Sequence, residues 1–123
     1  MTSESGDRKY LLAVDHGTSA MKVALTDSCG EVLAFEFEEN KLDLLPGGGA
    51  EQDPDEWWTT LLSCSRKLVE GGYVRAEQIA GICVSSQWSG TVAVDVNGNH
   101  LHNAIIWMDT RGEPHIKKAL KGI

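Results

Sequence analysis

Apolar and polar residues alternate along the first forty residues in a pattern that predicts three strands. Residues 10–15 form an apolar run that ends at an acid, residues 21–26 alternate, and residues 31–38 alternate with their large apolar side chains on one face. Asp27 opens and Gly30 closes the turn between the second and third runs. Short connections of this kind predict an antiparallel three-strand meander.

Residues 53–72 carry the clearest helix pattern of the chain. Asp53 can cap this helix, Pro54 suits its first turn, and Glu56 completes a capping box. Two glycines at 71–72 end the helix, and the preceding residues 40–50, with a proline and three glycines, are predicted to be a loop. Helical spacing predicts one core face, which consists of Trp58, Leu61, Leu62, Ser65, Leu68 and Val69.

The later pattern predicts a mixed sheet. Residues 79–85 are a short apolar run, which we expect to form a buried strand parallel to the first. Residues 91–96 and 101–107 flank Asn97-Gly98 and predict a hairpin, and a second helix starts near residue 113. A meander followed by a parallel crossover indicates an α/β fold with helices packed on the sheet. The last helix breaks off after about two turns, so we expect the chain to be the front part of a longer protein.

Composition restricts the functional class. The chain has 123 residues, is 41% hydrophobic and 24% charged, and therefore suits one modest globular domain. Its formal net charge of −7 argues against partnership with nucleic acid or an anionic membrane. No apolar run approaches the roughly 20 residues of a membrane span. The three cysteines have no spacing typical of a metal or redox site, which indicates a reducing compartment, the cytoplasm. Residues 1–9 are expected to be a disordered tail without a signal peptide.

The turn after the first strand carries groups that suit phosphate. Gly17 permits close approach of a ligand, the hydroxyls of Thr18 and Ser19 can donate hydrogen bonds, and Lys22 adds a positive charge. Asp15 would repel phosphate unless a divalent cation such as Mg²⁺ lay between them. The alternative is an ordinary tight β-hairpin in which the lysine faces solvent.

Four segments, in order, resemble one enzyme family. The Asp-x-Gly-Thr-Ser sequence at 15–19 resembles the first phosphate motif of the sugar kinase, heat-shock and actin superfamily. Residues 51–58 (EQDPDEWW), 86–90 (SQWSG) and 103–111 (NAIIWMDTR) resemble segments of the FGGY carbohydrate kinases, xylulokinase-like members especially. The resemblance implies a ribonuclease H-like, actin-like ATPase fold. It also implies that residues 10–123 are the first part of domain I, with the remainder of that domain and domain II absent.

The same resemblance implies a reaction and a set of site residues. The reaction would be ATP-dependent phosphorylation of a sugar or polyol hydroxyl, with a pentulose such as xylulose favoured. Asp15 would lie near Mg²⁺, while the ATP phosphates would contact Gly17, Thr18, Ser19 and Lys22. The sugar contacts would come from two segments, and they are Gln87, Trp88, Ser89, Trp107, Asp109 and Arg111.

Some residues leave alternatives open. Trp88, Ser89 and Met108 stand where the family pattern has Met, His and Asn, so we expect a departure from strict xylulokinase specificity. Asp109 and Arg111 could instead form an ion pair that steadies their loop. We expect Trp57 and Trp58 to be core residues, and the four histidines to be solvent or turn residues with no ligand spacing.

The resemblance also places one essential group elsewhere. The catalytic base, an Asp, is expected beyond residue 123, so we expect the chain alone to be inactive. The rival hypothesis is a non-catalytic sugar-binding or assembly module with an actin-like fold. An incomplete sheet would also expose core surface, through which a homodimer could form.

Overall fold

The computed structural model describes residues 8–121, so most of the tail expected at 1–9 lies outside the described residues. The chain divides into two compact units. The first contains the residues up to Asn40 together with Trp57–Ser86, and the second contains Lys41–Glu56 and the residues from Gln87 onward. Within residues 8–121 no helix combines the length and the apolar character that a membrane crossing needs.

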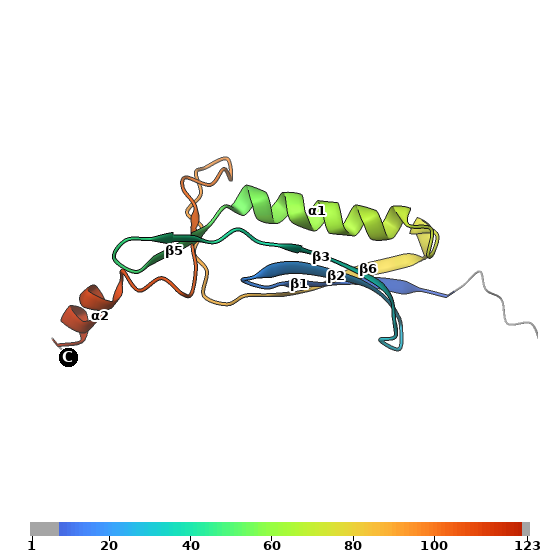
Figure 1. Cartoon of the computed structure of the whole chain (residues 1–123), viewed down its shortest axis with the longest axis horizontal. Helices are drawn as coiled ribbons and strands as arrows, with labels where there is room; N and C mark the ends of the chain where they lie inside the picture. Colours follow the sequence, from blue (N-terminus) through green and yellow to red (C-terminus); the bar gives the residue numbers. More distant parts are fainter. Residues whose placement is uncertain (1–7, 122–123) are drawn as a thin grey trace, which may run out of the picture. The chain divides into compact units, whose positions relative to one another are not determined.

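The first unit is a four-stranded sheet covered by a helix (Figure 1). Its strand order is β3-β2-β1-β6, in which β1 and β2 are antiparallel, β2 and β3 are antiparallel, and β6 runs parallel to β1. The predicted meander and parallel crossover are therefore confirmed. Its elements are β1 (Tyr10–His16), β2 (Ala20–Asp27), β3 (Val32–Glu39), α1 (Pro54–Glu70), the 3₁₀ turn η1 (Ala76–Gln78) and β6 (Ile79–Ser86).

The core of this unit lies between the sheet and α1. Alternate residues of β1 and β2 point toward the helix, and the buried ones pack with Cys64 and Leu68 of α1. The helix begins as expected, because Asp53 Oδ1 accepts a hydrogen bond of 2.9 Å from the Asp55 amide. The buried strand residues of this cluster are Tyr10, Leu12, Val14, Met21, Val23 and Leu25.

The buried face of α1 differs from the predicted one. Its fully buried positions are Thr60, Cys64 and Leu68, whereas Trp58 is 61% exposed. Leu68 is buried as predicted, and Leu61 and Val69 pack against the core, but the assignment of Trp58 to this face and to the core was wrong. Small side chains at two of the three buried positions allow the helix backbone to approach the sheet, and a tryptophan on that face would hold it away.

Strand β3 turns its acids toward the helix and its aromatic residues away from it. Glu38 Oε1 accepts hydrogen bonds from Ser63 Oγ at 2.5 Å and from Lys67 Nζ at 2.7 Å, which lowers the pKa of this glutamate. Phe35 and Phe37 are 65% and 58% exposed on the opposite face. The predicted shared face of large apolar residues is thus present but uncovered. Whether it mediates a homodimer stays a prediction.

Strand β6 is parallel to β1 as predicted, but it is not buried. Ile82 and Val84 each remain 65% exposed. The strand lies at the edge of the sheet, where its side chains find few neighbours.

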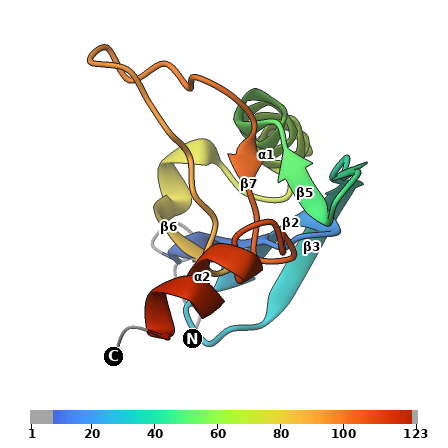
Figure 2. The same ribbon diagram turned by 90° about the vertical axis from the view of Figure 1, so that its left-hand side faces the viewer.

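The second unit is a three-stranded sheet with the order β4-β5-β7. Its strands are β4 (Asp43–Leu45), β5 (Gly49–Gln52) and β7 (Ala104–Ile105), and Figure 2 shows β5 and β7 side by side. The loop predicted over residues 40–50 is wrong, because β4 and β5 pair as a hairpin. The residues that suggested a loop form its tip, where Gly47 and Gly48 have φ angles of 78° and 87°.

The other predicted hairpin is shorter than expected. Residues 91–107 contain only the two residues of β7 and two isolated bridges, Thr91 with Ile105 and Val94 with His100. The turn itself forms, because Asp95 Oδ1 accepts the amides of Asn97 and Asn99. A helix follows at α2 (Glu113–Leu120), as the sequence predicted.

The packing of α1 on the sheet makes a direct prediction about stability. Leu68 is 1% exposed, so we expect Leu68→Ala to leave a cavity and to lower the free energy of unfolding by about 2–5 kcal/mol in urea denaturation. The matched control is Leu44→Ala, because Leu44 is 68% exposed and its truncation should cost less than about 0.5 kcal/mol. Equal losses in the two variants would show that the sheet and α1 do not form this core.

Candidate functional site

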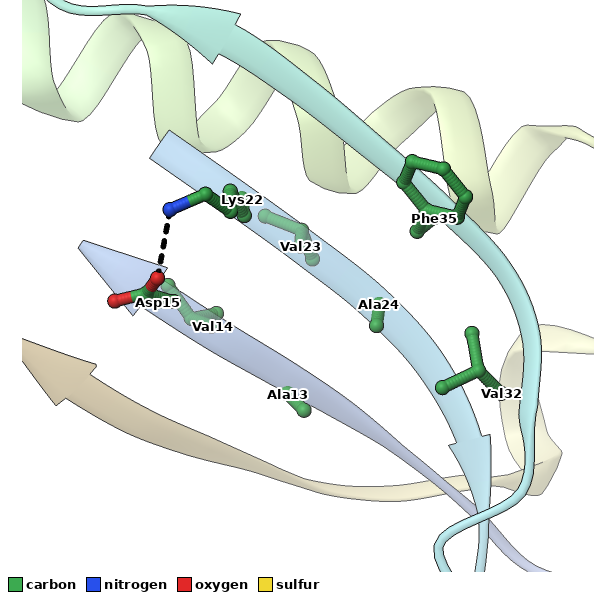
Figure 3. A pocket seen from close by; sticks show the side chains of 8 residues that line it. All are labelled: Ala13, Val14, Asp15, Lys22, Val23, Ala24, Val32 and Phe35. Carbon is green, nitrogen blue, oxygen red and sulfur yellow. Dashed lines mark hydrogen bonds and ion pairs between the residues drawn. The ribbon is translucent and has the colours of Figure 1, made fainter. Parts of the chain in front are cut away.

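The turn between β1 and β2 joins the two charged residues of the predicted phosphate site. Asp15 and Lys22 are paired across the two strands, and Lys22 Nζ lies 2.9 Å from Asp15 Oδ2. Figure 3 shows both side chains on the near face of the sheet, with α1 behind the strands. Each side chain is about half exposed, so the ion pair is weak and either group can turn to a ligand.

Asn40 holds this turn at two points. Its Nδ2 donates to the Gly17 carbonyl at 2.8 Å, and its backbone amide donates to the Ser19 carbonyl at 2.9 Å. The turn also closes on itself, because the Gly17 amide donates to the Ala20 carbonyl at 3.1 Å. Asn40 was not identified from the sequence as a residue of this site. The only signal was its place two residues after the end of the third predicted strand.

Gly17 lies in the turn beside the ion pair and carries no side chain. A Cβ atom built on Gly17 would lie 3.2 Å from the Ala20 carbonyl oxygen, 3.5 Å from Lys22 Nζ and 3.8 Å from Asp15 Oδ2. A side chain at this position would crowd the Ala20 carbonyl and touch the carboxylate and the ammonium group, so glycine keeps the turn backbone uncovered beside both charges. A carboxylate with adjoining phosphate oxygens is a donor set that Mg²⁺ accepts, so the residues present fit a magnesium–nucleotide phosphate group.

The face that carries the ion pair also has an apolar depression of about 390 Å³. Asp15 and Lys22 line it together with small and apolar residues from the three strands of the meander (Figure 3). These apolar lining residues are Ala13, Val14, Val23, Ala24, Val32 and Phe35. The turn between β1 and β2 thus borders an open surface of the sheet.

His16 lies on the other face of β1, against Trp57 of α1. Their ring centroids are 4.6 Å apart in an edge-to-face arrangement. Burial lowers the pKa of His16, although the neighbouring Asp15 opposes this shift. The expectation that His16 is a solvent or turn residue was wrong, whereas Trp57 packs inward as expected.

In the second unit, Asp109 joins its loop to β5. The Asp109 side chain is 5% exposed, and its Oδ2 accepts hydrogen bonds from the Ala50 amide at 2.9 Å and from Arg111 Nε at 2.8 Å. Its Oδ1 accepts the Arg111 amide at 3.0 Å. These bonds lower the pKa of Asp109 from 3.8 to about 2, and the hydrogen bond from the Arg111 side chain has the largest effect.

Arg111 connects two carboxylates. One of its terminal nitrogens lies 2.6 Å from Asp109 Oδ2 and 2.6 Å from Glu51 Oε1, and both acids raise the pKa of the guanidinium. The ion pair proposed for Asp109 and Arg111 is therefore present. Glu51 was missed as its second partner, because the sequence pattern pointed only to the helix that follows. A Cβ on Gly49 would lie 3.1 Å from Arg111 Nε, so this glycine permits the approach.

The other predicted sugar segment is also bound to β5, because its first residue, Gln87, contacts the side chain of Gln52. Gln87 Nε2 donates to Gln52 Oε1 at 2.8 Å, and the Gln52 side chain is almost fully buried. Trp88 follows with 75% of its surface exposed, and Ser89 has a φ angle of 58°, a conformation that costs energy in a residue with a side chain. Trp107 of the later segment is also half exposed. Strand β5 thus contacts both segments predicted to bind sugar.

His100 lies at the first turn of α1, which sequence reasoning did not foresee. Its Nε2 is 3.1 Å from Asp55 Oδ2 and 4.0 Å from Asp53 Oδ1, and the contact with Asp55 raises the pKa of the imidazole. This arrangement fastens the shorter hairpin to the start of the helix. His102 and His115 are exposed, as expected.

Three comparisons with known proteins agree on one family. Residues 10–121 match the model of the N-terminal domain of the FGGY family of carbohydrate kinases. Xylulose kinase of Bacillus subtilis (strain 168) is 37% identical over 106 residues, which are 86% of this chain and 21% of that protein. The chain therefore spans about a fifth of the length of this relative.

Solved structures show the same fold. Gluconate kinase from Lactobacillus acidophilus superposes with a TM-score of 0.85 and 26% identity, over 94% of this chain and 23% of that one. Glycerol kinase from Plasmodium falciparum, solved with ADP, superposes with a TM-score of 0.75 and 24% identity, over 98% of this chain and 24% of that one. The expected actin-like ATPase fold is thereby confirmed, in a chain that covers only a part of it.

The contacts of Asp109 predict how stability changes in acid. Because folding lowers its pKa from 3.8 to about 2, the stabilisation is complete above pH 4 and is lost as the pH falls toward 2. We expect Asp109→Asn to unfold at lower urea than the wild type at pH 7 and to converge with it near pH 2. Asp43→Asn, which removes a half-exposed acid of the same unit, should keep the wild-type pH profile. A constant gap between Asp109→Asn and the wild type from pH 5 to pH 2 would contradict this account.

Proposed function

The chain belongs to the FGGY family of carbohydrate kinases, and on that premise we propose that it is the N-terminal part of an enzyme that phosphorylates a sugar or polyol with ATP. The proposal concerns the whole protein, because this chain spans only about a fifth of the length of the xylulose kinase that it matches. The observation that carries it is the glycine turn beside Asp15 and Lys22, because it brings together a carboxylate, an ammonium group and an uncovered glycine backbone, which suit phosphate oxygens and a cation.

The turn would hold the phosphate groups of the nucleotide. Asp15 would hold Mg²⁺, which supplies positive charge to the phosphoryl group during transfer. The hydroxyl residues Thr18 and Ser19 would donate hydrogen bonds to phosphate oxygens, and Gly17, whose own amide donates to the Ala20 carbonyl, would let a phosphate group approach the backbone. Lys22 would leave its ion pair with Asp15 and add a second positive charge. Asn40 would keep the turn in this shape through its two hydrogen bonds.

The second unit would supply the sugar contacts. Gln87 and Ser89 would hydrogen-bond hydroxyl groups, and Trp88 and Trp107 would pack on the apolar face of the sugar. These predicted contacts also include Asp109 and Arg111, whose mutual ion pair fixes the direction of the carboxylate and the guanidinium. A pentulose such as xylulose is the favoured substrate, because a xylulose kinase is 37% identical over most of this chain.

The base that accepts the hydroxyl proton is proposed to be an Asp outside this sequence. Within the described residues, Asp15 and Asp109 are already assigned to the cation and to the sugar segment. We therefore propose that the chain alone does not turn over. The described cysteines Cys29, Cys64 and Cys83 are all unpaired, which supports a reducing compartment and hence the cytoplasm as the proposed location.

Nucleotide binding tests the proposal on the chain itself. We expect isothermal titration calorimetry to detect binding of Mg·ATP, and removal of Mg²⁺ with EDTA to weaken it. Asp15→Asn should weaken it about tenfold or more, because a charged contact is lost. Gly17→Ala should have a similar effect, because its Cβ would crowd the Ala20 carbonyl and contact both charged groups.

The controls separate this effect from general damage. Gly81→Ala places a Cβ at an ordinary 3.6 Å from Leu11, and Asp43→Asn removes an exposed lysine–aspartate pair elsewhere, so neither should alter Mg·ATP affinity. A coupled assay with ATP, Mg²⁺ and a panel of pentuloses should show no turnover by the chain. Equal Mg·ATP affinity in Asp15→Asn, Gly17→Ala and the wild type would refute the phosphate site, and robust turnover would refute the proposal that the base lies elsewhere.

A further inference from the structure

Gln52 connects the buried end of β5 to the first residue of a predicted sugar segment. It is 1% exposed, and its neighbour along the strand, Glu51, is tied to Arg111 of the other sugar segment. A buried side-chain amide needs partners for both its oxygen and its nitrogen, since water cannot supply them. Two of the partners are the backbone carbonyl of Lys41 and the side chain of Gln87.

The Lys41 carbonyl determines which way the Gln52 amide faces. A carbonyl oxygen can only accept, so Gln52 must turn its nitrogen toward it, and the Nε2–O distance is 3.0 Å. The Gln52 oxygen then points to Gln87, 2.8 Å from the Gln87 nitrogen. Rotating either amide by 180° would bring two oxygens or two nitrogens together at one of these contacts. The Lys41 carbonyl therefore fixes the orientation of the Gln52 amide, and the Gln52 amide in turn fixes that of Gln87.

We propose that Gln52 is a positioning residue for the sugar site, which fixes Gln87 with its nitrogen toward β5 and its carbonyl oxygen away from β5. The inference rests on the proposed function, in which Gln87 contacts the sugar. The Gln87 oxygen, with its two lone pairs, accepts a hydrogen bond from a sugar hydroxyl in this orientation. With the amide reversed, a donor would stand in the same place.

The segment that follows Gln87 needs such a fixed point. Trp88 is 75% exposed, and Ser89 adopts a positive φ angle. Regular backbone pairing resumes only at Thr91, whose amide donates to the Ile105 carbonyl at 2.8 Å. The Gln52–Gln87 hydrogen bond thus anchors the start of the segment, and the pairing of Thr91 anchors its end.

Two substitutions at Gln52 separate orientation from packing. Gln52→Leu keeps the approximate size of the side chain and removes both hydrogen bonds. Gln52→Glu removes the donor to Lys41 but keeps an acceptor for Gln87, so it should partly rescue the position of Gln87. The matched control is Gln78→Leu in the first unit. Gln78 is also buried, and its amide bonds the Arg8 carbonyl and the Arg75 amide.

The first measurement needs no sugar. In the ¹⁵N-labelled chain, the side-chain amide signals of Gln87 are identified by their loss in Gln87→Leu, and their exchange with water is measured by NMR. We expect slow exchange in the wild type and in Gln78→Leu, fast exchange in Gln52→Leu, and slower exchange in Gln52→Glu than in Gln52→Leu. Unchanged protection of Gln87 in Gln52→Leu would overturn the proposal.

The second measurement is the affinity for D-xylulose, followed in the same samples by backbone amide shifts. Gln52→Leu should weaken binding about tenfold, as expected for one lost hydrogen bond, while Gln78→Leu should bind as the wild type does. Equal affinity in Gln52→Leu and the wild type would overturn the positioning role. Absence of xylulose binding in the wild type would count against the proposed substrate instead, and the exchange measurement would still decide whether Gln52 orients Gln87.

Discussion

The antiparallel pairing of β1 with β2 is the constraint on which the first unit depends. Its register places Asp15 opposite Lys22 and leaves the turn around Gly17 between them. The same register sends alternate apolar residues to the opposite face, where α1 covers them. A shift by one residue would bury the charged pair and expose the core. Burial of the apolar face therefore holds Asp15 and Lys22 in place on the other face of the sheet.

The second unit uses polar contacts where the first uses apolar packing. Strand β5 has only four residues, yet the Ala50 amide, the Glu51 carboxylate and the Gln52 amide each bind a residue of a predicted sugar segment. Gly48 and Gly49, at the start of this strand, let the segment that carries Arg111 come close. The ion pair between Asp109 and Arg111, first considered as an alternative to a sugar contact, fixes the directions of the groups that would meet the sugar.

The elements that could be predicted from the sequence are those whose residue pattern has a single physical explanation. The meander followed from alternation and short turns, and α1 followed from its cap and its terminal glycines. The place of Leu68 on the buried face of α1 was predicted, but those of Thr60 and Cys64 were not, because close approach of the helix favoured them over the more apolar Trp58. The hairpin of β4 and β5 was missed because Pro46 and the glycines after it suit a hairpin tip as well as a loop. Asn40 and Gln52 were missed because their roles come from partners distant in sequence.

The central claim is that the turn after β1 binds the phosphates of a magnesium nucleotide. Backbone amide shifts of the ¹⁵N-labelled chain, followed during titration with Mg·ATP, test it most directly. The account predicts that the largest changes fall on Gly17, Thr18 and Ser19, spread to Asn40 through its two hydrogen bonds to the turn, and disappear when EDTA removes the metal. Saturable changes confined to other parts of the chain, with residues 15–22 unaffected, would contradict it.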